Sequence, residues 1–466
     1  MYKIILEGTK NKYDYEELVK VFLRPDMFVL VSEAADTGGG DDDAEYEKII
    51  RISADSKEIK NLVKQKLYKE LVEITGFSPE WGILTGVRPV KIARMLMSEH
   101  KSYKKAFSVL TDFYYLSEKK AELILDTYLY QHEALKSSPK DAAGVYIGIP
   151  FCPTRCLYCS FASNQVADSE IERYLQALYR ETDAVGAMMK EKNIIPESLY
   201  IGGGTPTTLD ERQLAELLDR IYGAFDMSAV KEFTVEAGRP DTITEGKLKV
   251  IEEKGAGRIS INPQTMKDST LELIGRNHTA GDIRNAFKMA ARRPALDINT
   301  DVIAGLPGET PKDFEATLSE LTALRPANIT VHTLAVKRAS RLIDVDPDFH
   351  YKQGETVREM LVIAEKMLRS AGYRPYYLYR QKHMAGAYEN TGWCLDGCES
   401  IYNIRIMDES QSIVALGAGG ISKAYFPEED RLERVPNVTN YEQYIDRIDE
   451  MIERKRINLF GEGKKC

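Results

Sequence analysis

The chain has 466 residues, of which 43% are hydrophobic and 29% are charged, a composition that suits about three globular domains. Its net charge of −9 provides no long-range attraction for nucleic acid or anionic lipid, so we expect neither as a partner. No apolar stretch reaches the roughly 20 residues of a membrane span, and the first apolar run is too short for a signal peptide, which predicts a cytoplasmic protein. Six cysteines are too few for a disulfide scaffold.

Residues 1–140 are predicted to form a separate α+β and helical extension. Its predicted strands are short β-like runs: 2–6, 27–32 and 48–52. A helical stretch with two Gly/Pro breaks follows at 56–135. The polar segment 136–140 is predicted as a linker, which places a domain boundary near residue 140.

Residues 141–340 alternate between predicted strands and helices. The predicted strands are 145–149, 198–202, 232–236, 258–261, 297–304 and 328–334. The predicted helices are 169–192, 210–224, 244–254, 280–292 and 311–324. Ser169 and Glu172 form a predicted capping box at the first helix. This α/β alternation predicts a parallel sheet, and a partial (βα)6 TIM-like barrel would place its chemistry on the loops after the strands.

Beyond residue 340 the alternation ends, and residues 341–466 are predicted as a C-terminal α/β segment. The pattern indicates a helix at 351–371, an aromatic and basic run at 373–381, a β-like run at 412–416 and a charged helix at 441–455.

Three cysteines with the spacing C-x3-C-x2-C follow the first predicted strand of the barrel, at Cys152, Cys156 and Cys159. Thiolates are the usual ligands of iron–sulfur clusters, and a short loop brings several of them together. Three ligands for a cube of four irons leave one iron open to another molecule. A closed zinc site would need a fourth protein ligand, and no nearby His or Cys provides one. The spacing therefore predicts a 4Fe-4S cluster.

With Tyr158 before the last cysteine, this motif resembles the hallmark of the radical S-adenosylmethionine (SAM) superfamily. The resemblance implies that the open iron binds the amino and carboxylate groups of SAM. It also implies that reduction of the cluster cleaves SAM to a 5′-deoxyadenosyl radical, which abstracts hydrogen from the substrate. An electron donor such as a flavodoxin or ferredoxin is then an implied partner. No side chain is assigned as catalytic, because the radical is generated at the cluster.

The turn after the second strand contains three glycines, which let a backbone approach a ligand closely. Its Gly-Gly-Gly-Thr-Pro-Thr form resembles the oxygen-independent coproporphyrinogen III oxidases. That resemblance implies a set of SAM-binding residues, which occur in the family's order: Tyr146, Tyr158, Gly203, Gly204, Thr205, Glu236, Gln264, Arg276, Asp301 and Ala335. Glu236 matches the carboxylate that binds the ribose hydroxyls, and Arg276 can bind the SAM carboxylate through two N–H groups.

Two positions depart from those oxidases. Gly148 stands where the family usually has a histidine assigned to substrate-side chemistry, and Phe161 stands where it has a further cysteine. Haem chaperones of the same family share the Cys-x-Phe ending but carry a His-Asn-x-x-Tyr-Trp motif, which the segment from His383 to Trp393 does not match. The extension 1–140 and the C-terminal segments are most similar to a HemZ-like branch, described as coproporphyrinogen dehydrogenase-like.

The resemblance implies a tetrapyrrole substrate and a role in haem biosynthesis, with residues 341–466 on the substrate side. In the parent reaction two propionates of coproporphyrinogen III become the vinyls of protoporphyrinogen IX. The alternatives are a haem-binding chaperone of the same family and a radical SAM enzyme for another tetrapyrrole. Arg374, Arg380 and Lys382 could anchor propionates, or could belong to an exposed basic-aromatic surface. Cys394 and Cys398 could hold a second cluster, although we expect free thiols on a loop.

Overall fold

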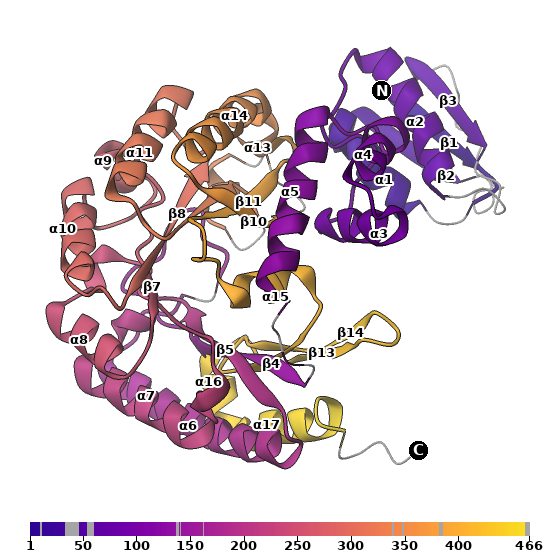
Figure 1. The fold of residues 1–466 in the computed structure, drawn as a ribbon. Coiled ribbons are helices and arrows are strands. Elements are labelled where there is room, and N and C mark those ends of the chain that lie inside the picture. Colours follow the sequence, from indigo (N-terminus) through magenta and orange to yellow (C-terminus); the bar gives the residue numbers. More distant parts are fainter. Residues whose placement is uncertain are drawn as a thin grey trace.

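The computed structural model (Figure 1) describes residues 1–9, 12–32, 46–53, 60–136, 139, 141–161, 163–337, 340–346, 349–381 and 385–461. Lys382 and His383, for which roles were considered above, lie outside these ranges. Within the described part of the chain, no helix is both long enough and apolar enough to cross a membrane.

The N-terminal region contains a small parallel sheet with the strand order β2-β1-β3. The three predicted β-like runs are confirmed as β1 (Tyr2–Glu7), β2 (Phe28–Ser32) and β3 (Lys48–Ser53). Five helices accompany this sheet: α1 (Tyr13–Phe22), α2 (Lys60–Thr75), α3 (Val90–His100), α4 (Tyr103–Ser108) and α5 (Glu118–Ala134). Side-chain caps at Ser102 and Ser117 start α4 and α5, at two helix breaks that were not predicted within the helical stretch 56–135.

The central sheet has eleven strands, and six consecutive parallel strands form its middle. All six were predicted: β4 (Ala142–Ile149), β5 (Ile195–Gly203), β6 (Glu232–Glu236), β7 (Arg258–Ser260), β8 (Asp297–Ala304) and β9 (Asn328–Thr333). The crossover helices form the outer arc in Figure 1: α6 (Asp168–Glu191), α7 (Glu211–Ala224), α8 (Glu245–Glu253), α9 (Asp268–Leu273), α10 (Ala280–Ala291) and α11 (Pro311–Leu324). The partial (βα)6 barrel is thereby confirmed.

Apolar strands and capped helices explain why this region folds as predicted. Val145, Ile147 and Ile149 of β4 are completely buried, as expected for parallel strands covered on both faces. Capping boxes start α7, α10 and α11. The capping box predicted at Ser169 is wrong. α6 begins at Asp168 after the uncapped Ala167, and the Glu172 carboxylate instead accepts a hydrogen bond from Gln213 of α7 (2.9 Å).

The C-terminal segment extends the central sheet at both edges. β12 (Ser412–Leu416) pairs parallel with β4, and β13 (Ile421–Phe426) and β14 (Arg431–Pro436) continue antiparallel. At the other edge β11 (Glu389–Cys394) pairs antiparallel with both β9 and β10 (Arg374–Arg380). The helices of this segment are α12 (Leu342–Val345), α13 (Phe349–Lys352), α14 (Gly354–Ser370), α15 (Ile401–Asp408), α16 (Tyr441–Asp446) and α17 (Ile448–Asn458). The single helix predicted at 441–455 is therefore two helices.

The expected exposed basic-aromatic surface at 373–381 is wrong. This run is mostly strand β10, and its Tyr376 and Tyr377 are buried in the core. Arg380 is also buried and donates to the backbone oxygens of Leu84 and Ala387, so it faces the N-terminal region. Of the two arginines in this run, only Arg374 is exposed.

The N-terminal region packs against β10 and β11 through α5 (Figure 1). At this contact Lys120 Nζ lies 2.5 Å from the Glu389 carboxylate, which also accepts a hydrogen bond from Trp81 Nε1 (2.9 Å). Buried apolar side chains from both sides of residue 140 belong to one contiguous cluster. The boundaries near residues 140 and 340 stay predictions.

Candidate functional site

A cavity of about 240 Å³ lies where the parallel strands end, at the carboxyl edge of the barrel. Its lining includes the three cysteines and nine of the ten residues predicted to bind SAM. The predicted residues that line it are Cys152, Cys156, Cys159, Tyr158, Gly203, Gly204, Thr205, Glu236, Gln264, Arg276, Asp301 and Ala335. Loops that follow different strands thus bring residues as distant in sequence as Cys152 and Ala335 into one chamber, which is the barrel geometry predicted above.

The cysteine loop leaves β4 and is held on both sides by backbone hydrogen bonds. Cys152 N donates to Asn164 O (3.1 Å), and Leu157 N donates to Ile274 O (2.9 Å). Burial raises the pKa of the Cys152 thiol, and the other two cysteines lie near enough to raise it further. Among the described residues, no three His, Cys, Asp or Glu side chains converge as a single metal ion would need. A cube of four irons binds its thiolates at separate corners, so the donor set fits a 4Fe-4S cluster.

The glycine turn after β5 lies directly against the cysteine loop. A Cβ on Gly204 would stand 2.4 Å from Phe151 O and 2.9 Å from Cys152 Sγ, so any larger residue would displace the loop. Gly203 has a φ of +114°, a backbone conformation that favours glycine. The turn is fixed to the loop by a hydrogen bond from Thr205 N to Phe151 O (2.7 Å). The glycines therefore keep backbone groups close to the thiols and accessible from the cavity.

Two carboxylates line the cavity beside this turn. Glu236 Oε2 accepts a hydrogen bond from Gly203 N (3.2 Å), and burial together with the charge of Asp301 raises the pKa of Glu236 to about 8. Asp301 Oδ2 lies 3.7 Å from His332 Nε2. An acceptor held at the cavity wall can bind ligand hydroxyls, which is the role predicted for Glu236.

Several buried polar atoms at the cavity have no hydrogen-bond partner within the described part of the chain: Asn262 Oδ1, Gln264 Oε1 and Arg276 Nε. Arg276 is otherwise well held, since it donates to Asn262 O (2.5 Å) and Tyr158 OH (3.1 Å). Gln264 adopts a left-handed backbone, with φ of +68°. Buried polar atoms without partners are costly unless a ligand satisfies them, so this wall fits a polar ligand such as SAM.

Tyr146 does not line the cavity. Its ring lies inside the barrel, stacked with Tyr200 (6.2 Å between ring centroids) and Tyr402 (6.3 Å). Its hydroxyl is behind the glycine turn, 3.3 Å from where a Cβ on Gly203 would stand. Its contact with SAM stays a prediction.

Cys394 and Cys398 lie far from this chamber. Cys394 is the last residue of β11 and pairs with Asn328 at the amino end of β9, opposite the cavity. It is completely buried, packed with Tyr376, so the expectation of two thiols on a loop is wrong for Cys394. Both thiols are free, as expected.

Several cavity residues were not singled out from the sequence for this site. They lie on loops after β4, β6, β7 and β9, within β9, or on and directly after the antiparallel strands β10 and β11: Phe161, Arg239, Asn262, His332, Lys337, Tyr379, Gln381 and Asn390. Tyr379 of β10 and Gln381, the residue after β10, flank the buried Arg380, which points to the opposite face. Strand alternation around position 380 could have separated cavity residues from core residues, had the run been recognised as a strand.

Comparisons with known proteins agree with this geometry. The family model described as the radical SAM superfamily matches residues 146–321. The chain is 37% identical over 404 residues to the oxygen-independent coproporphyrinogen-III oxidase-like protein HemZ of Bacillus subtilis, covering 86% of this chain and 81% of that protein. It is 30% identical over 308 residues to the haem chaperone HemW of Bacillus subtilis, covering 66% of this chain and 76% of the chaperone.

The fold is also similar to that of solved structures. Among them is the coproporphyrinogen III oxidase HemN of Escherichia coli, described as a radical SAM enzyme, with a TM-score of 0.52 and 21% sequence identity. The match covers 69% of this chain and 72% of that one. At this identity the likeness supports the fold and not the reaction.

Proposed function

Because the chain belongs to the radical SAM superfamily and to its HemZ-like group, we propose that it converts propionate side chains of coproporphyrinogen III to vinyl groups without oxygen. Membership of the superfamily implies a 4Fe-4S cluster and SAM as cofactors. The observation that carries the proposal is a single cavity that is lined by three thiols, the glycine turn after β5 and two carboxylates.

The residues present fit these cofactors, and each has a proposed task. Cys152, Cys156 and Cys159 bind the cluster, and the backbone of Gly203 and Gly204 approaches the methionyl end of SAM. When bound and reduced, the cluster and SAM supply a 5′-deoxyadenosyl radical. The protein's remaining work is to orient the bound groups and to exclude water from them.

The polar wall of the chamber would hold SAM in one orientation. Glu236 accepts hydrogen bonds from the ribose hydroxyls, and Arg276 donates to the carboxylate through its unpaired Nε. Gln264 offers the unpaired oxygen of its amide. These contacts would satisfy atoms that the chain itself leaves without partners, which is why we assign SAM to this wall.

In the proposed reaction a hydrogen atom leaves the β-carbon of a substrate propionate and becomes part of 5′-deoxyadenosine. The carboxylate then leaves as carbon dioxide, and one electron passes to a one-electron acceptor, which leaves a vinyl group. A low-potential one-electron donor, such as a flavodoxin or ferredoxin, would supply the electron that the bound cluster needs. Gly148 provides no side chain at the position where the oxidases usually have a histidine, so any proton needed there must come from another group.

A second candidate is a haem-binding chaperone, which the identity to HemW favours. The two candidates share the cluster and differ in what happens to the tetrapyrrole. A chaperone would bind haem in a stoichiometric amount without turnover, whereas the enzyme would consume SAM and substrate together.

One anaerobic experiment separates them. Reconstituted protein receives a reductant, SAM and coproporphyrinogen III, and the products are separated by chromatography. Protoporphyrinogen IX together with 5′-deoxyadenosine supports the proposal. Haem binding without turnover supports the chaperone, and 5′-deoxyadenosine with unchanged porphyrinogen would overturn the substrate while keeping the enzyme class.

A further inference from the structure

The cavity needs a cation for an anionic substrate, and the two arginines predicted for this role do not reach it. Arg380 lies on the opposite face of β10, bonded to Leu84 O and Ala387 O. Arg374 is exposed and lies 3.8 Å from Asp396, at the amino end of the barrel strands. Neither lines the cavity. Propionate recognition therefore has to come from another group.

Among the described residues, three cationic side chains line the cavity: Arg239, Arg276 and Lys337. Arg239 donates two hydrogen bonds to the Asp241 carboxylate, from Nε and Nη2, each 3.0 Å long. The positive charge of Arg239 is therefore already compensated. Arg276 donates to Asn262 O and Tyr158 OH beside the cysteines, in the part of the wall that we assign to SAM. Lys337 has no carboxylate within ion-pair distance in the described part of the chain.

Lys337 has a different kind of neighbour. Its Nζ lies 5.9 Å from the centre of the Phe161 ring, in a cation–π contact. Phe161 also lines the cavity, yet 66% of it is exposed to solvent, which is unusual for a phenylalanine. Phe161 follows β4 and Lys337 follows β9, so the pair joins loops from the first and last of the six parallel strands. An exposed ring beside a cation without a carboxylate partner is suited to a ligand that is both apolar and anionic.

We propose that Phe161 and Lys337 form the tetrapyrrole anchor at the opening of this cavity. The Phe161 ring packs on a pyrrole face, and Lys337 binds a propionate carboxylate. This inference rests on the proposed function for its substrate class. It also gives a physical role to the residue that replaces the family's extra cysteine, since a thiol could not provide a stacking surface.

The position of Lys337 relative to the SAM wall supports this anchor. Ala335, which is predicted to contact SAM, lies two residues before Lys337, and Cys159 lies two residues before Phe161. The anchor is therefore adjacent to the cofactor groups along both loops. A tetrapyrrole held there would present one propionate to the cavity interior while another propionate is bound at the opening.

The test measures binding of coproporphyrin III, the stable oxidised form of the substrate, to reconstituted protein with SAM by anaerobic equilibrium dialysis. Lys337→Met is expected to weaken binding about tenfold, which corresponds to about 1.4 kcal/mol. Lys337→Arg should restore most of the affinity. Phe161→Ala should weaken binding about fivefold, and Phe161→Tyr should stay within about twofold of the parent protein.

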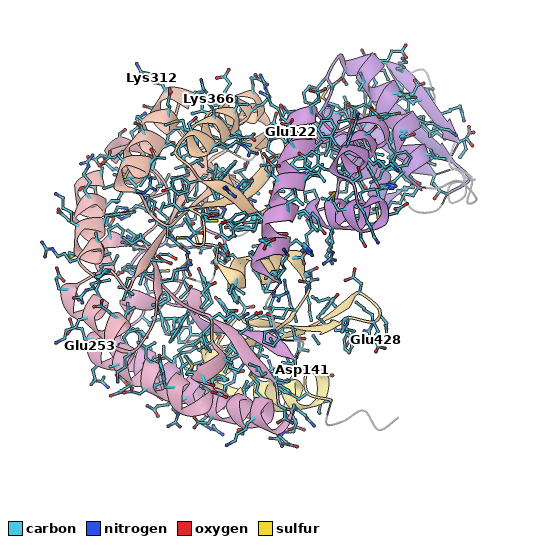
Figure 2. The ribbon with its side chains drawn as sticks, viewed as in Figure 1. Glu122, Asp141, Glu253, Lys312, Lys366 and Glu428 are labelled. Atoms are coloured by element: carbon cyan, nitrogen blue, oxygen red, sulfur yellow. The ribbon has the colours of Figure 1, made fainter. Side chains whose placement is uncertain are left out.

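Lys312→Met is the matched control, because Lys312 is exposed on α11 and points away from the molecule (Figure 2). The tetramethyl ester of coproporphyrin III completes a double-mutant cycle. If Lys337 binds a carboxylate, Lys337→Met should change ester binding by less than about twofold. Iron content and SAM affinity, measured on each variant, should match the parent protein and so show that the fold and cofactor site are intact.

The outcomes are distinct. Unchanged coproporphyrin affinity in Lys337→Met and Phe161→Ala would overturn the anchor and leave the proposed function standing. Weaker binding in these variants, with no turnover of coproporphyrinogen III by the parent protein, would support the anchor and overturn the proposed reaction. If the parent protein bound no tetrapyrrole, both proposals would fail.

Discussion

The two ends of the parallel strands differ in the surroundings of a buried carboxylate: Glu232 is the first residue of β6 and Glu236 is its last. At the amino end Glu232 accepts hydrogen bonds from Ser400 Oγ (2.7 Å), Thr234 Oγ1 (2.9 Å) and two backbone N–H groups of α15. At the carboxyl end Glu236 lines the cavity, and burial together with the charge of Asp301 raises its pKa. The protein itself therefore satisfies Glu232, whereas Glu236 is available to a ligand. Glu232 contributes stability, and Glu236 lowers stability at a place where a ligand can bind.

The largest effect is expected at the cysteines. Cys156→Ala removes one of three thiolate ligands, so the reconstituted protein should lose the 4Fe-4S absorption and all formation of 5′-deoxyadenosine. Cys394→Ala, at the opposite end of the barrel, is the control and should keep its iron. Full iron content in Cys156→Ala, or loss of about four irons in Cys394→Ala, would contradict the assignment.

At the amino end we expect a large loss of stability without a loss of SAM binding. Glu232→Ala leaves the buried donors of Ser400, Ile401 and Tyr402 unpaired, which should lower the free energy of unfolding by about 3 kcal/mol. Urea unfolding measures this change, and Glu253→Ala on the outer surface of α8 (Figure 2) should alter it by less than about 0.5 kcal/mol. A stable Glu232→Ala protein would show that the two ends do not differ in this way.

At the carboxyl end we expect the opposite: a substitution that weakens SAM binding and increases stability. Glu236→Gln removes one acceptor for the ribose hydroxyls and should weaken SAM binding about tenfold. Because the pKa of Glu236 is raised from 4.5 to about 8, the folded protein loses stability as the pH rises between these values. Glu236→Gln should abolish that loss and increase the free energy of unfolding at pH 8.5 by about 1–3 kcal/mol.

The pH dependence provides the check on Glu236. Urea unfolding of both proteins from pH 5 to 8.5 should give diverging stabilities, with the variant the more stable at high pH. If the free energies of unfolding of the two proteins had the same pH dependence, Glu236 would not lower stability. If SAM affinity in equilibrium dialysis were unchanged, Glu236 would not bind SAM.

The smallest effect is expected at Arg374. It was predicted as a propionate anchor but is exposed beside Asp396, away from the cavity. Arg374→Met should leave the KM for coproporphyrinogen III within about twofold, because an exposed ion pair contributes little. A tenfold increase in KM would show that Arg374 of β10 contacts the substrate after all.

The sequence predicts the barrel region well, because its strands, helix caps and cysteine spacing are recognised from neighbouring residues in the chain. β6 and β8 have the predicted bounds, because each is a short β-like run of five to eight residues between helices that begin with side-chain caps. The site residues on loops after those strands could be placed together for the same reason, since the barrel brings the carboxyl ends of its strands to one edge. The spacing of Cys152, Cys156 and Cys159 needs no tertiary information at all.

The edge strands could not be predicted in this way. β11 has the sequence Glu-Asn-Thr-Gly-Trp-Cys, in which all six residues are buried, so no polar and apolar alternation marks it. Its pairing with β9 and β10 and its contact with Trp81 and Lys120 are long-range. The burial of Arg380, and with it the loss of a predicted anchor, follows from the packing of the N-terminal region, which no local pattern reports.

The central claim is that the open end of the barrel directs a SAM-derived radical to a propionate of a tetrapyrrole. Coproporphyrinogen III deuterated at the β-carbons of its propionates tests this directly, in an anaerobic reaction with the reduced, reconstituted protein and SAM. Mass spectrometry of the 5′-deoxyadenosine should show one deuterium for each vinyl group formed. Undeuterated 5′-deoxyadenosine, produced in the same amount, would contradict the account.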